Sequence, residues 1–299
     1  LEYAKDEVFT VGSREIVTPR ANRVILATRP KEAIMGFQED MVPHLESLGR
    51  EADLAFMAGY HYTEEVQADG RTWEEYLADT QRDLAALRSQ NPNLRIHYEY
   101  VPMKVEELEP QVLTSICGQV QSFGVNENEI KRVLKNYGFT EEYEAIQADE
   151  RAYTLYKGAV RLFRHWGLER LHVHNLGYYV VVLAKPYPVS VEKVRQACLY
   201  ASAVNALKAK YGGYAQPEKL GETIDWPLSD IGFAQLRSAY TDLREEIPGL
   251  TEEFLATGIL EQDDHYLLVV PSHVIPNPVS TVGMGDTISS SSYLAELDG

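Results

Sequence analysis

The sequence predicts an α/β fold in which a mostly parallel sheet carries helices on both faces. Strand-like and helix-like segments alternate along most of the 299 residues. The connections between strands are long enough to hold helices of about ten residues or more, as parallel strands require. Ligands bind beyond the carboxyl ends of the strands in such sheets, so functional residues are expected directly after strands.

The N-terminal region predicts short strands without intervening helices. Val8–Val11 and Glu15–Val17 flank Gly12-Ser13, a pair that is typical of a hairpin turn. Arg23–Thr28 predicts a further strand. Because the region before about residue 30 differs in kind from the rest, we expect it to belong to a smaller, separate sheet.

Helices and strands then follow in turn. In Thr72–Ser89, leucines recur at helical spacing. Asn126 is a good N-cap for a helix that Gly138 closes. The other helices are expected at Gln38–Leu48, Glu106–Ile116, Glu127–Tyr137, in a long region that ends at Trp166, at Val191–Ala209, at Ser229–Glu246, and from near Gly285. The strands are expected at Asp53–Ala58, Leu94–Val101, Gln119–Val125, Arg170–His174, Tyr178–Leu183, Gly258–Glu261 and Tyr266–Val270.

The composition excludes several classes of function. A net charge of −17 argues against nucleic acid and against an anionic membrane surface as partners, since both need clustered lysine and arginine. A small anion can still be held by backbone amides, a few arginines and a metal ion. No apolar run approaches the roughly 20 residues that cross a bilayer. Cys117 and Cys198 are expected to be reduced core thiols, which indicates the cytosol.

The segment Ser280–Ser289 carries the most specific chemical signal. Gly283 and Gly285 stand before Asp286 at the predicted start of the last helix. A helix N-terminus presents unpaired amides and the positive end of the helix dipole, which suit a developing phosphoryl charge. Asp286 would be placed to take a proton from a sugar hydroxyl. On spacing alone, a simple helix cap explains this aspartate as well.

Four segments, in the same order and spacing, resemble motifs of the archaeal-type ADP-dependent glucokinase/phosphofructokinase family of the ribokinase-like superfamily. Asn277–Ser290 resembles the C-terminal signature, and His97-Tyr98-Glu99 resembles the His-x-Glu motif. Asn126–Glu129 resembles the Asn-x-x-Glu motif, and His172–Tyr179 resembles the strand pair beside the adenine. The resemblance covers essentially the whole chain.

The resemblance implies a ribokinase-like three-layer α/β/α domain with part of a small β-rich lid. On this basis we assign residues 1–30 to the lid and hinge strands, and residues 31–299 to the nucleotide-binding domain. Members of the family carry a long N-terminal portion ahead of the point where this chain begins. That portion would hold several sugar-contacting residues, so the calls below concern the phosphate-transfer half of the site.

By resemblance, ADP is the phosphoryl donor, Mg²⁺ or another divalent cation is the cofactor, and Asp286 is the catalytic base. Phosphoryl transfer needs mainly positioning and neutralisation of charge. The amides from Gly283 through Met284 and Gly285 to Asp286 would form the anion hole. Glu99 and Glu129 lie in the motifs associated with magnesium and would bind it through water, and Asp286 is the third candidate metal ligand. Residue chemistry alone also allows a solvated Glu129 and an ordinary strand histidine at position 97.

The resemblance also implies nucleotide contacts. Arg23 matches the segment in which the family places a phosphate-binding arginine, whose planar fork suits phosphate; the alternative is a surface arginine at the start of a strand. Tyr178 and Ile275 match positions that line the adenine pocket, and His174 is a weaker candidate. A tyrosine in a strand is also commonly a core residue.

The acceptor is expected to be fructose 6-phosphate. Arg29 ends a segment that resembles the phosphofructokinases, and an arginine there suits the dianion of a sugar phosphate. His61 stands where the family usually has glutamine, so glucose stays open as a second acceptor. The alternatives are an ADP-dependent glucokinase and, from another class, a non-catalytic nucleotide-binding protein or inactive fragment. The oligomeric state stays open.

Overall fold

The computed structural model describes residues 2–3, 6–18, 22–23, 36–213 and 217–297. The chain divides into two compact units, Leu1–Ala33 and Ile34–Gly299. In the first unit, β1 (Glu2–Tyr3) pairs with β4 (Asn22–Arg23) in antiparallel register. The hairpin of β2 (Val8–Val11) and β3 (Arg14–Val17) confirms the turn predicted at Gly12-Ser13, because Gly12 has a φ of 63° that suits glycine.

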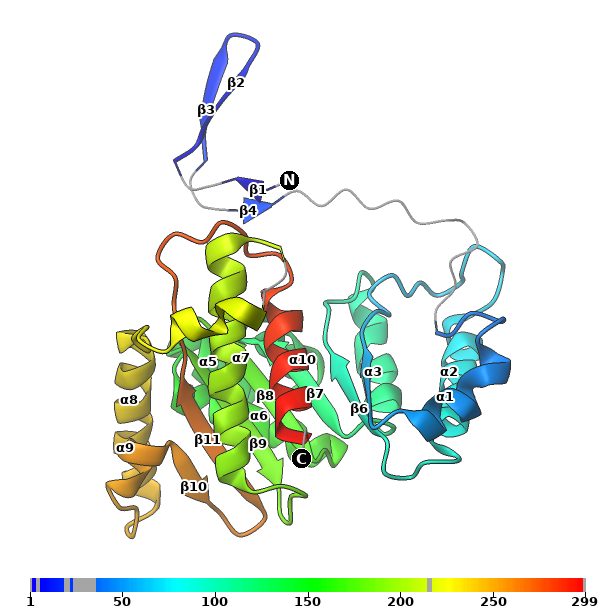
Figure 1. Ribbon diagram of the computed structural model, residues 1–299. Coiled ribbons are helices and arrows are strands. Elements are labelled where there is room, and N and C mark those ends of the chain that lie inside the picture. The colour runs from blue at the N-terminus through cyan, green and yellow to red at the C-terminus, as the bar shows by residue number, and fades with distance from the viewer. Residues whose placement is uncertain (1, 4–5, 19–21, 24–35, 214–216, 298–299) are drawn as a thin grey trace. The chain divides into compact units, whose positions relative to one another are not determined.

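The second unit contains a seven-stranded sheet in the order β10-β11-β9-β8-β7-β6-β5 (Figure 1). Four neighbouring strands, β5 to β8, are mutually parallel, whereas β9 runs antiparallel to β8 and to β11. The predicted α/β class is therefore confirmed. The strands span Leu54–Met57 (β5), Arg95–Glu99 (β6), Ser122–Asn126 (β7), Arg170–Asn175 (β8), Tyr178–Ala184 (β9), Ile259–Glu261 (β10) and His265–Pro271 (β11).

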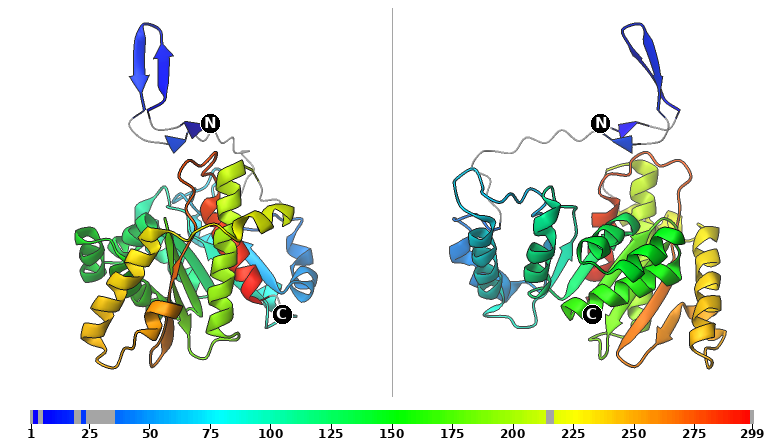
Figure 2. Two further views of the ribbon diagram at one scale, coloured as in Figure 1. Left: turned by 60° about the vertical axis from the view of Figure 1, so that its left-hand side comes forward. Right: turned by 180° about the vertical axis from the view of Figure 1, so that it is seen from behind.

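Helices cover both faces of this sheet and make three layers (Figure 2). Helices α7 and α10 lie together on one face, and α10 contacts β7 and β8. Helices α4, α6 and α8 pack on the opposite face. The helices span Leu45–Glu51 (α1), Trp73–Arg88 (α2), Glu109–Cys117 (α3), Glu127–Asn136 (α4), Thr140–Ala148 (α5), Ala152–Trp166 (α6), Val191–Tyr211 (α7), Asp230–Glu246 (α8), Glu253–Thr257 (α9) and Met284–Leu297 (α10).

The larger apolar core lies on the face of the sheet that α4 and α6 cover. Every second residue along the strands contributes an apolar side chain to it. Tyr98, Phe123 and Val173 point into it and are essentially inaccessible to solvent. A second apolar cluster lies between α7 and the strands β9 and β11, and it includes Val181 and Val194. The face that α7 and α10 cover is not apolar throughout, because alternate residues of β6 to β8 that face α10 are polar.

Two helical expectations need correction. The first helix begins at Leu45 rather than near Gln38, after a 3₁₀ turn at Val42–His44 that contains Pro43. Proline has no backbone N–H group to donate to the preceding turn, so a regular helix does not run through it. The long helical region that ends at Trp166 is two helices. Arg151, which has extended backbone, lies between them, and its amide donates a capping hydrogen bond to Thr154 Oγ1 (3.2 Å). Among the described residues, no helix has the length and apolar character that crossing a bilayer requires.

Candidate active site

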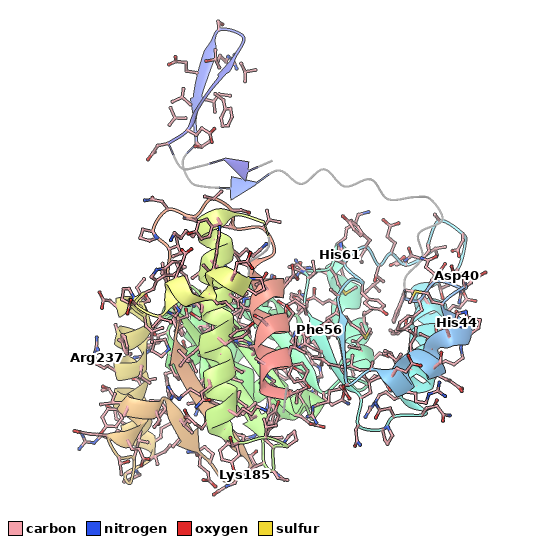
Figure 3. All side chains as sticks on the ribbon, in the orientation of Figure 1. Asp40, His44, Phe56, His61, Lys185 and Arg237 are labelled. Carbon is pink, nitrogen blue, oxygen red and sulfur yellow. The ribbon has the colours of Figure 1, made fainter. Side chains whose placement is uncertain are left out.

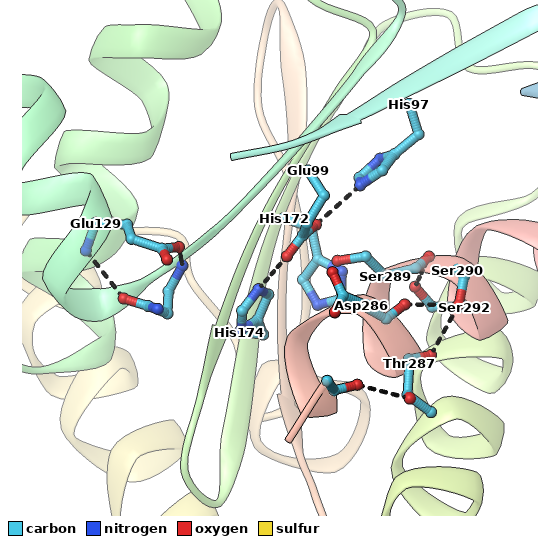
Figure 4. Close-up of polar contacts among 12 residues, drawn as sticks. His97, Glu99, Glu129, His172, His174, Asp286, Thr287, Ser289, Ser290 and Ser292 are labelled. Carbon is cyan, nitrogen blue, oxygen red and sulfur yellow. Dashed lines mark hydrogen bonds and ion pairs between the residues drawn. The ribbon is translucent and has the colours of Figure 1, made fainter. Parts of the chain in front are cut away.

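The site residues gather where β6, β7 and β8 end beside the start of α10 (Figure 4). Glu99 is the last residue of β6, Asn126 is the last residue of β7, and His174 is the residue before the end of β8. Because these strands are parallel neighbours, their carboxyl ends meet at one edge of the sheet. His61, which follows β5, marks this edge in Figure 3, and Lys185, which follows β9, marks the opposite edge.

Helix α10 presents its N-terminus at this edge. Gly283 precedes the helix with a φ of 65°, a left-handed conformation that favours glycine. The carbonyl of Gly283 accepts hydrogen bonds from the amide (3.0 Å) and the hydroxyl (2.7 Å) of Thr287. The first-turn amides of a helix lack intrahelical partners and lie at the positive end of its dipole. Asp286 lies exposed in the same turn. The first turn of α10 therefore places amides that can bind an anion next to the carboxylate of Asp286.

Glu99 is buried and is held by a histidine on each side. Its Oε1 lies 2.9 Å from His174 Nε2, and its Oε2 lies 3.1 Å from His97 Nε2. Burial by itself would raise the pKa of Glu99, but the charge and hydrogen bond of His174 hold that pKa well below its usual range. Burial would likewise lower the pKa of His174, but the carboxylate of Glu99 raises it. The contact between the two side chains therefore favours the ionised carboxylate of Glu99 and the protonated imidazole of His174.

Glu129 lies in the first turn of α4, where it forms a capping box with Asn126. Its Oε2 accepts from the Asn126 amide (2.8 Å), and Asn126 Oδ1 accepts from the Glu129 amide (2.9 Å). Burial raises the pKa of Glu129 to about 7, and the nearby negative charge of Glu99 acts in the same direction. The ionised form of Glu129 is thus disfavoured until a cation lies near these two carboxylates.

The donor chemistry fits a hard divalent cation held partly through water. Within the described ranges, no group of three or more histidine, cysteine, aspartate or glutamate side chains converges as a ready-made metal cage. Mg²⁺ usually keeps several waters and binds one or two carboxylates together with substrate phosphates. Glu129 and Glu99 supply oxygen donors of that kind, and the negative charge of Glu99 near Glu129 would be neutralised by a cation there.

Two glycines allow the strands and α10 to come this close. A Cβ added to Gly285 would lie 3.0 Å from His174 Cε1 and 3.3 Å from Glu99 Oε1. A Cβ added to Gly124, in the middle of β7, would overlap Glu99 Oε2 and lie 2.9 Å from Ser289 Oγ on α10. Sequence reasoning missed Gly124. The signal was present, because a glycine inside a strand often marks a close approach.

The other predicted site residues lie as follows. Tyr178 is buried in the larger core, and its hydroxyl accepts from Asn175 Nδ2 (3.0 Å). Ile275 lies half-buried in the segment between β11 and α10. His61 lies beside Tyr62, with ring centroids 4.1 Å apart and ring planes inclined by 47°. Arg23 belongs to β4 in the first unit, where its side chain is not described, and Arg29 lies outside the described residues.

The structure therefore brings together Glu99, His174, Gly285 and the start of α10, and Glu129 lies apart from them in the first turn of α4, which follows β7 (Figure 4). Such a set can bind an anion at a helix N-terminus, hold a cation near it through carboxylates, and offer a further carboxylate as a base.

Comparison with known proteins shows which family this chain is similar to. A family model described as "ADP-specific Phosphofructokinase/Glucokinase conserved region" matches residues 1–295. An ADP-specific phosphofructokinase from Methanosarcina acetivorans is 32% identical, and the alignment covers 99% of this chain and 61% of that protein. Another from Thermococcus kodakarensis is 27% identical, with coverage of 99% and 62%.

A solved structure shares the fold as well. It is an ADP-dependent kinase in complex with fructose 6-phosphate and ADPβS, and it superposes with a TM-score of 0.86 at 30% identity. The alignment covers 99% of this chain and 64% of that one. The chain thus spans less than two thirds of the length of these relatives.

Proposed function

Since this chain belongs to the ADP-specific phosphofructokinase/glucokinase family, we propose that its protein transfers the β-phosphoryl group of ADP to fructose 6-phosphate and releases AMP. The observation that carries the proposal is the start of α10, where Gly283–Asp286 lies beside Glu99 and His174 at the carboxyl edge of the parallel strands. The relatives named as phosphofructokinases, and the kinase bound to fructose 6-phosphate and ADPβS, support the acceptor and the donor.

In the proposed mechanism, the amides of Gly283, Met284 and Gly285 hold the β-phosphoryl oxygens as charge develops on them. Asp286 accepts the proton of the attacking sugar hydroxyl. Glu99 and Glu129 hold Mg²⁺, directly or through water; when bound, the cation neutralises phosphate charge. Arg23 contacts the ADP phosphates, and His174, Tyr178 and Ile275 line the nucleotide side of the site.

The first unit and the acceptor side complete the proposal. We assign residues 1–30 to part of a lid with its hinge strands, and residues 31–299 to the nucleotide-binding domain. Arg29 binds the 6-phosphate of the sugar, and His61 lies on the sugar side. The protein acts in the cytoplasm, in line with Cys117 and Cys198, which are both buried free thiols.

A coupled assay for AMP release tests this function. The intact protein is incubated with ADP, Mg²⁺ and either fructose 6-phosphate or glucose. AMP formed with fructose 6-phosphate supports the proposal, whereas AMP formed only with glucose replaces it with an ADP-dependent glucokinase. ADP binding without AMP formation from either sugar would leave a non-catalytic nucleotide-binding protein.

Arg29→Ala separates the two acceptors. A charged hydrogen bond to phosphate contributes about 1.5–3 kcal/mol, so we expect KM for fructose 6-phosphate to rise by about tenfold or more. Turnover of glucose, where it occurs, stays unchanged, because glucose carries no phosphate. Arg14→Ala in the exposed β2–β3 hairpin is the control. An unchanged KM for fructose 6-phosphate in Arg29→Ala would reject the assigned role.

Glu129→Gln tests the metal assignment through pH. With a pKa of about 7, Glu129 is mostly protonated at pH 6 and mostly ionised at pH 8. Because a cation needs the carboxylate, the Mg²⁺ concentration for half-maximal activity should fall by about tenfold over this range. Glu129→Gln should raise the Mg²⁺ requirement and remove this pH dependence. A wild-type pH profile in the variant would contradict the assignment.

The same pKa has a consequence for stability. The folded, metal-free protein holds the Glu129 proton more tightly than the unfolded chain does, since the pKa rises from 4.5 to about 7. The contribution of this group to the free energy of unfolding is therefore complete at low pH and is lost as pH rises through about 7.

A further inference from the structure

The face of α10 that packs on the sheet is polar, and so are the strand positions beneath it. We call this set of buried contacts the polar layer. On α10 it consists of Gly285, Ser289, Ser292 and Glu296, which repeat at intervals of four, three and four residues on one helix face. On the strands it consists of His97, Glu99, Ser122, Gly124, Arg170, His172 and His174, at alternate positions of β6, β7 and β8.

Arg170 is the centre of this layer and is fully buried. Its Nε lies 3.2 Å from Glu296 Oε2 in the last turn of α10, and one terminal nitrogen donates to Ser292 Oγ (3.0 Å) on the same helix. That nitrogen also lies 3.3 Å from His172 Nδ1, and the other donates to Ser122 Oγ on β7 (3.3 Å). One guanidinium therefore joins α10 to two strands.

The bonds continue from Arg170 to the candidate active site. Ser122 Oγ lies 2.8 Å from His97 Nδ1, and His97 Nε2 lies 3.1 Å from Glu99 Oε2. Glu99 is the carboxylate against which Gly285 packs. The network thus begins at the last turn of α10, crosses three strands and returns to the first turn of the same helix.

Stability alone does not explain such a layer. Taking two charges out of water is unfavourable, and well-packed apolar residues often stabilise a fold as much as a buried ion pair does. The same sheet face uses apolar packing a few residues away, where Val181 of β9 and Val194 of α7 meet. The carboxylate of Glu296 keeps Arg170 charged by raising its pKa against the effect of burial, and Glu296 is itself fully buried.

A fork of hydrogen bonds does restrict geometry more than apolar packing does. The guanidinium has a fixed planar arrangement of donors, so it satisfies Glu296, Ser292 and Ser122 together only in one rotation and register of α10. A shift of one residue along a helix moves its end by about 1.5 Å and turns it by about 100°. Displacements of about 1 Å at a reacting centre lower rates by about a hundredfold.

We propose that Arg170 and Glu296 are positioning residues that fix the rotation and register of α10, and with them the direction of its first-turn amides and of Asp286. Neither side chain lies at the end of the strands where the proposed reaction takes place; both act through the helix. The kinetic consequence of this inference rests on the proposed function, whereas its structural consequence does not.

The test replaces the pair with apolar residues, Arg170→Met together with Glu296→Leu, in the intact protein. Because the double substitution removes both charges, it leaves no unpaired buried charge, and we expect the variant to fold. AMP release from ADP, Mg²⁺ and fructose 6-phosphate should show kcat lower by about ten- to a hundredfold, with KM for fructose 6-phosphate unchanged. Hydrogen–deuterium exchange should become faster in the first turn of α10, at Gly285–Ser289, relative to the sheet.

Arg170→Lys covers the case in which the double variant does not fold. Lysine keeps the positive charge opposite Glu296 but lacks the planar set of donors of the guanidinium. The variant should therefore fold and show a smaller fall in kcat and a smaller increase in exchange at the first turn of α10. The matched control is Arg132→Met with Glu109→Leu, which removes a pair 3.1 Å apart outside the polar layer, with Glu109 fully buried. The control should lower Tm and leave kcat per folded protein unchanged.

The outcomes separate the two proposals. A folded double variant, or a folded Arg170→Lys, with wild-type kcat and wild-type exchange in α10 overturns the positioning role. A loss of kcat of the same size in the control variant also overturns it, since the removal of any buried ion pair would then explain the effect. If the wild-type protein releases no AMP, the proposed function fails, and the exchange rates at Gly285–Ser289 alone decide the positioning role.

Discussion

Asp286→Asn is expected to lower kcat by about two to four orders of magnitude while the affinity for ADP stays nearly intact. Asparagine keeps the size and polarity of the side chain in the first turn of α10 but does not accept a proton at neutral pH. General bases contribute about 10²- to 10⁴-fold to rates, which sets the size of the effect. The hydroxyl of Ser290 bonds to the Asp286 backbone carbonyl (2.6 Å), so this local contact survives the substitution.

The measurement pairs AMP release with calorimetric titration of ADP into the variant. Asp230→Asn is the matched control, because Asp230 is likewise an acidic residue in the first turn of a helix, α8. It should leave kcat unchanged. A kcat for Asp286→Asn within a few-fold of wild type would reject Asp286 as the base. A parallel loss of ADP binding would instead assign Asp286 to nucleotide or metal binding.

Local signals explain why the sequence predicted the start of the last helix well. Glycines and helix starts depend on neighbouring residues, and α10 begins at Met284, next to the expected start near Gly285. The N-cap at Asn126 was recognisable for the same reason, and the structure adds that Asn126 forms a capping box with Glu129. Likewise, the alternation of strands and helices follows from periodicity within each segment.

Contacts between segments that are distant in the chain could not be predicted from such local signals. Glu99 and His174 meet because β7 lies between their strands in one particular register, and nothing in either segment states which strand is its neighbour. Arg170 and Glu296 are 126 residues apart in the chain. The alternating polar residues of β8 were visible in the sequence, but their pattern reads as a solvated face until a helix is known to cover it.

Gly124→Ala is the substitution that tests this non-local geometry most sharply. The added Cβ would overlap Glu99 Oε2 and lie 2.9 Å from both His97 Nε2 and Ser289 Oγ. Glu99 is the end of a side chain, but His97 and His174 hold it in place, and Ser289 belongs to a helix packed on the strand. Something must therefore move: Glu99 out of its histidine pair, or α10 away from the sheet.

Either movement displaces groups of the proposed phosphoryl-transfer site. We expect kcat to fall by about a hundredfold and the Mg²⁺ requirement to rise, because a 1 Å displacement is enough for a loss of that size. Overpacking a buried position should also lower the free energy of unfolding by about 1–3 kcal/mol. AMP release at several Mg²⁺ concentrations measures the first effect, and denaturant unfolding measures the second.

Gly249→Ala is the control, since Gly249 is exposed and an added Cβ there meets nothing within 4 Å. It should leave both quantities at their wild-type values. Gly124→Ala with normal turnover and a normal Mg²⁺ requirement would mean that Glu99 moves without consequence, and Glu99 would then lose its place in the site. A fall in stability with unchanged turnover would point to the same conclusion, because the close approach at Gly124 would then serve packing alone.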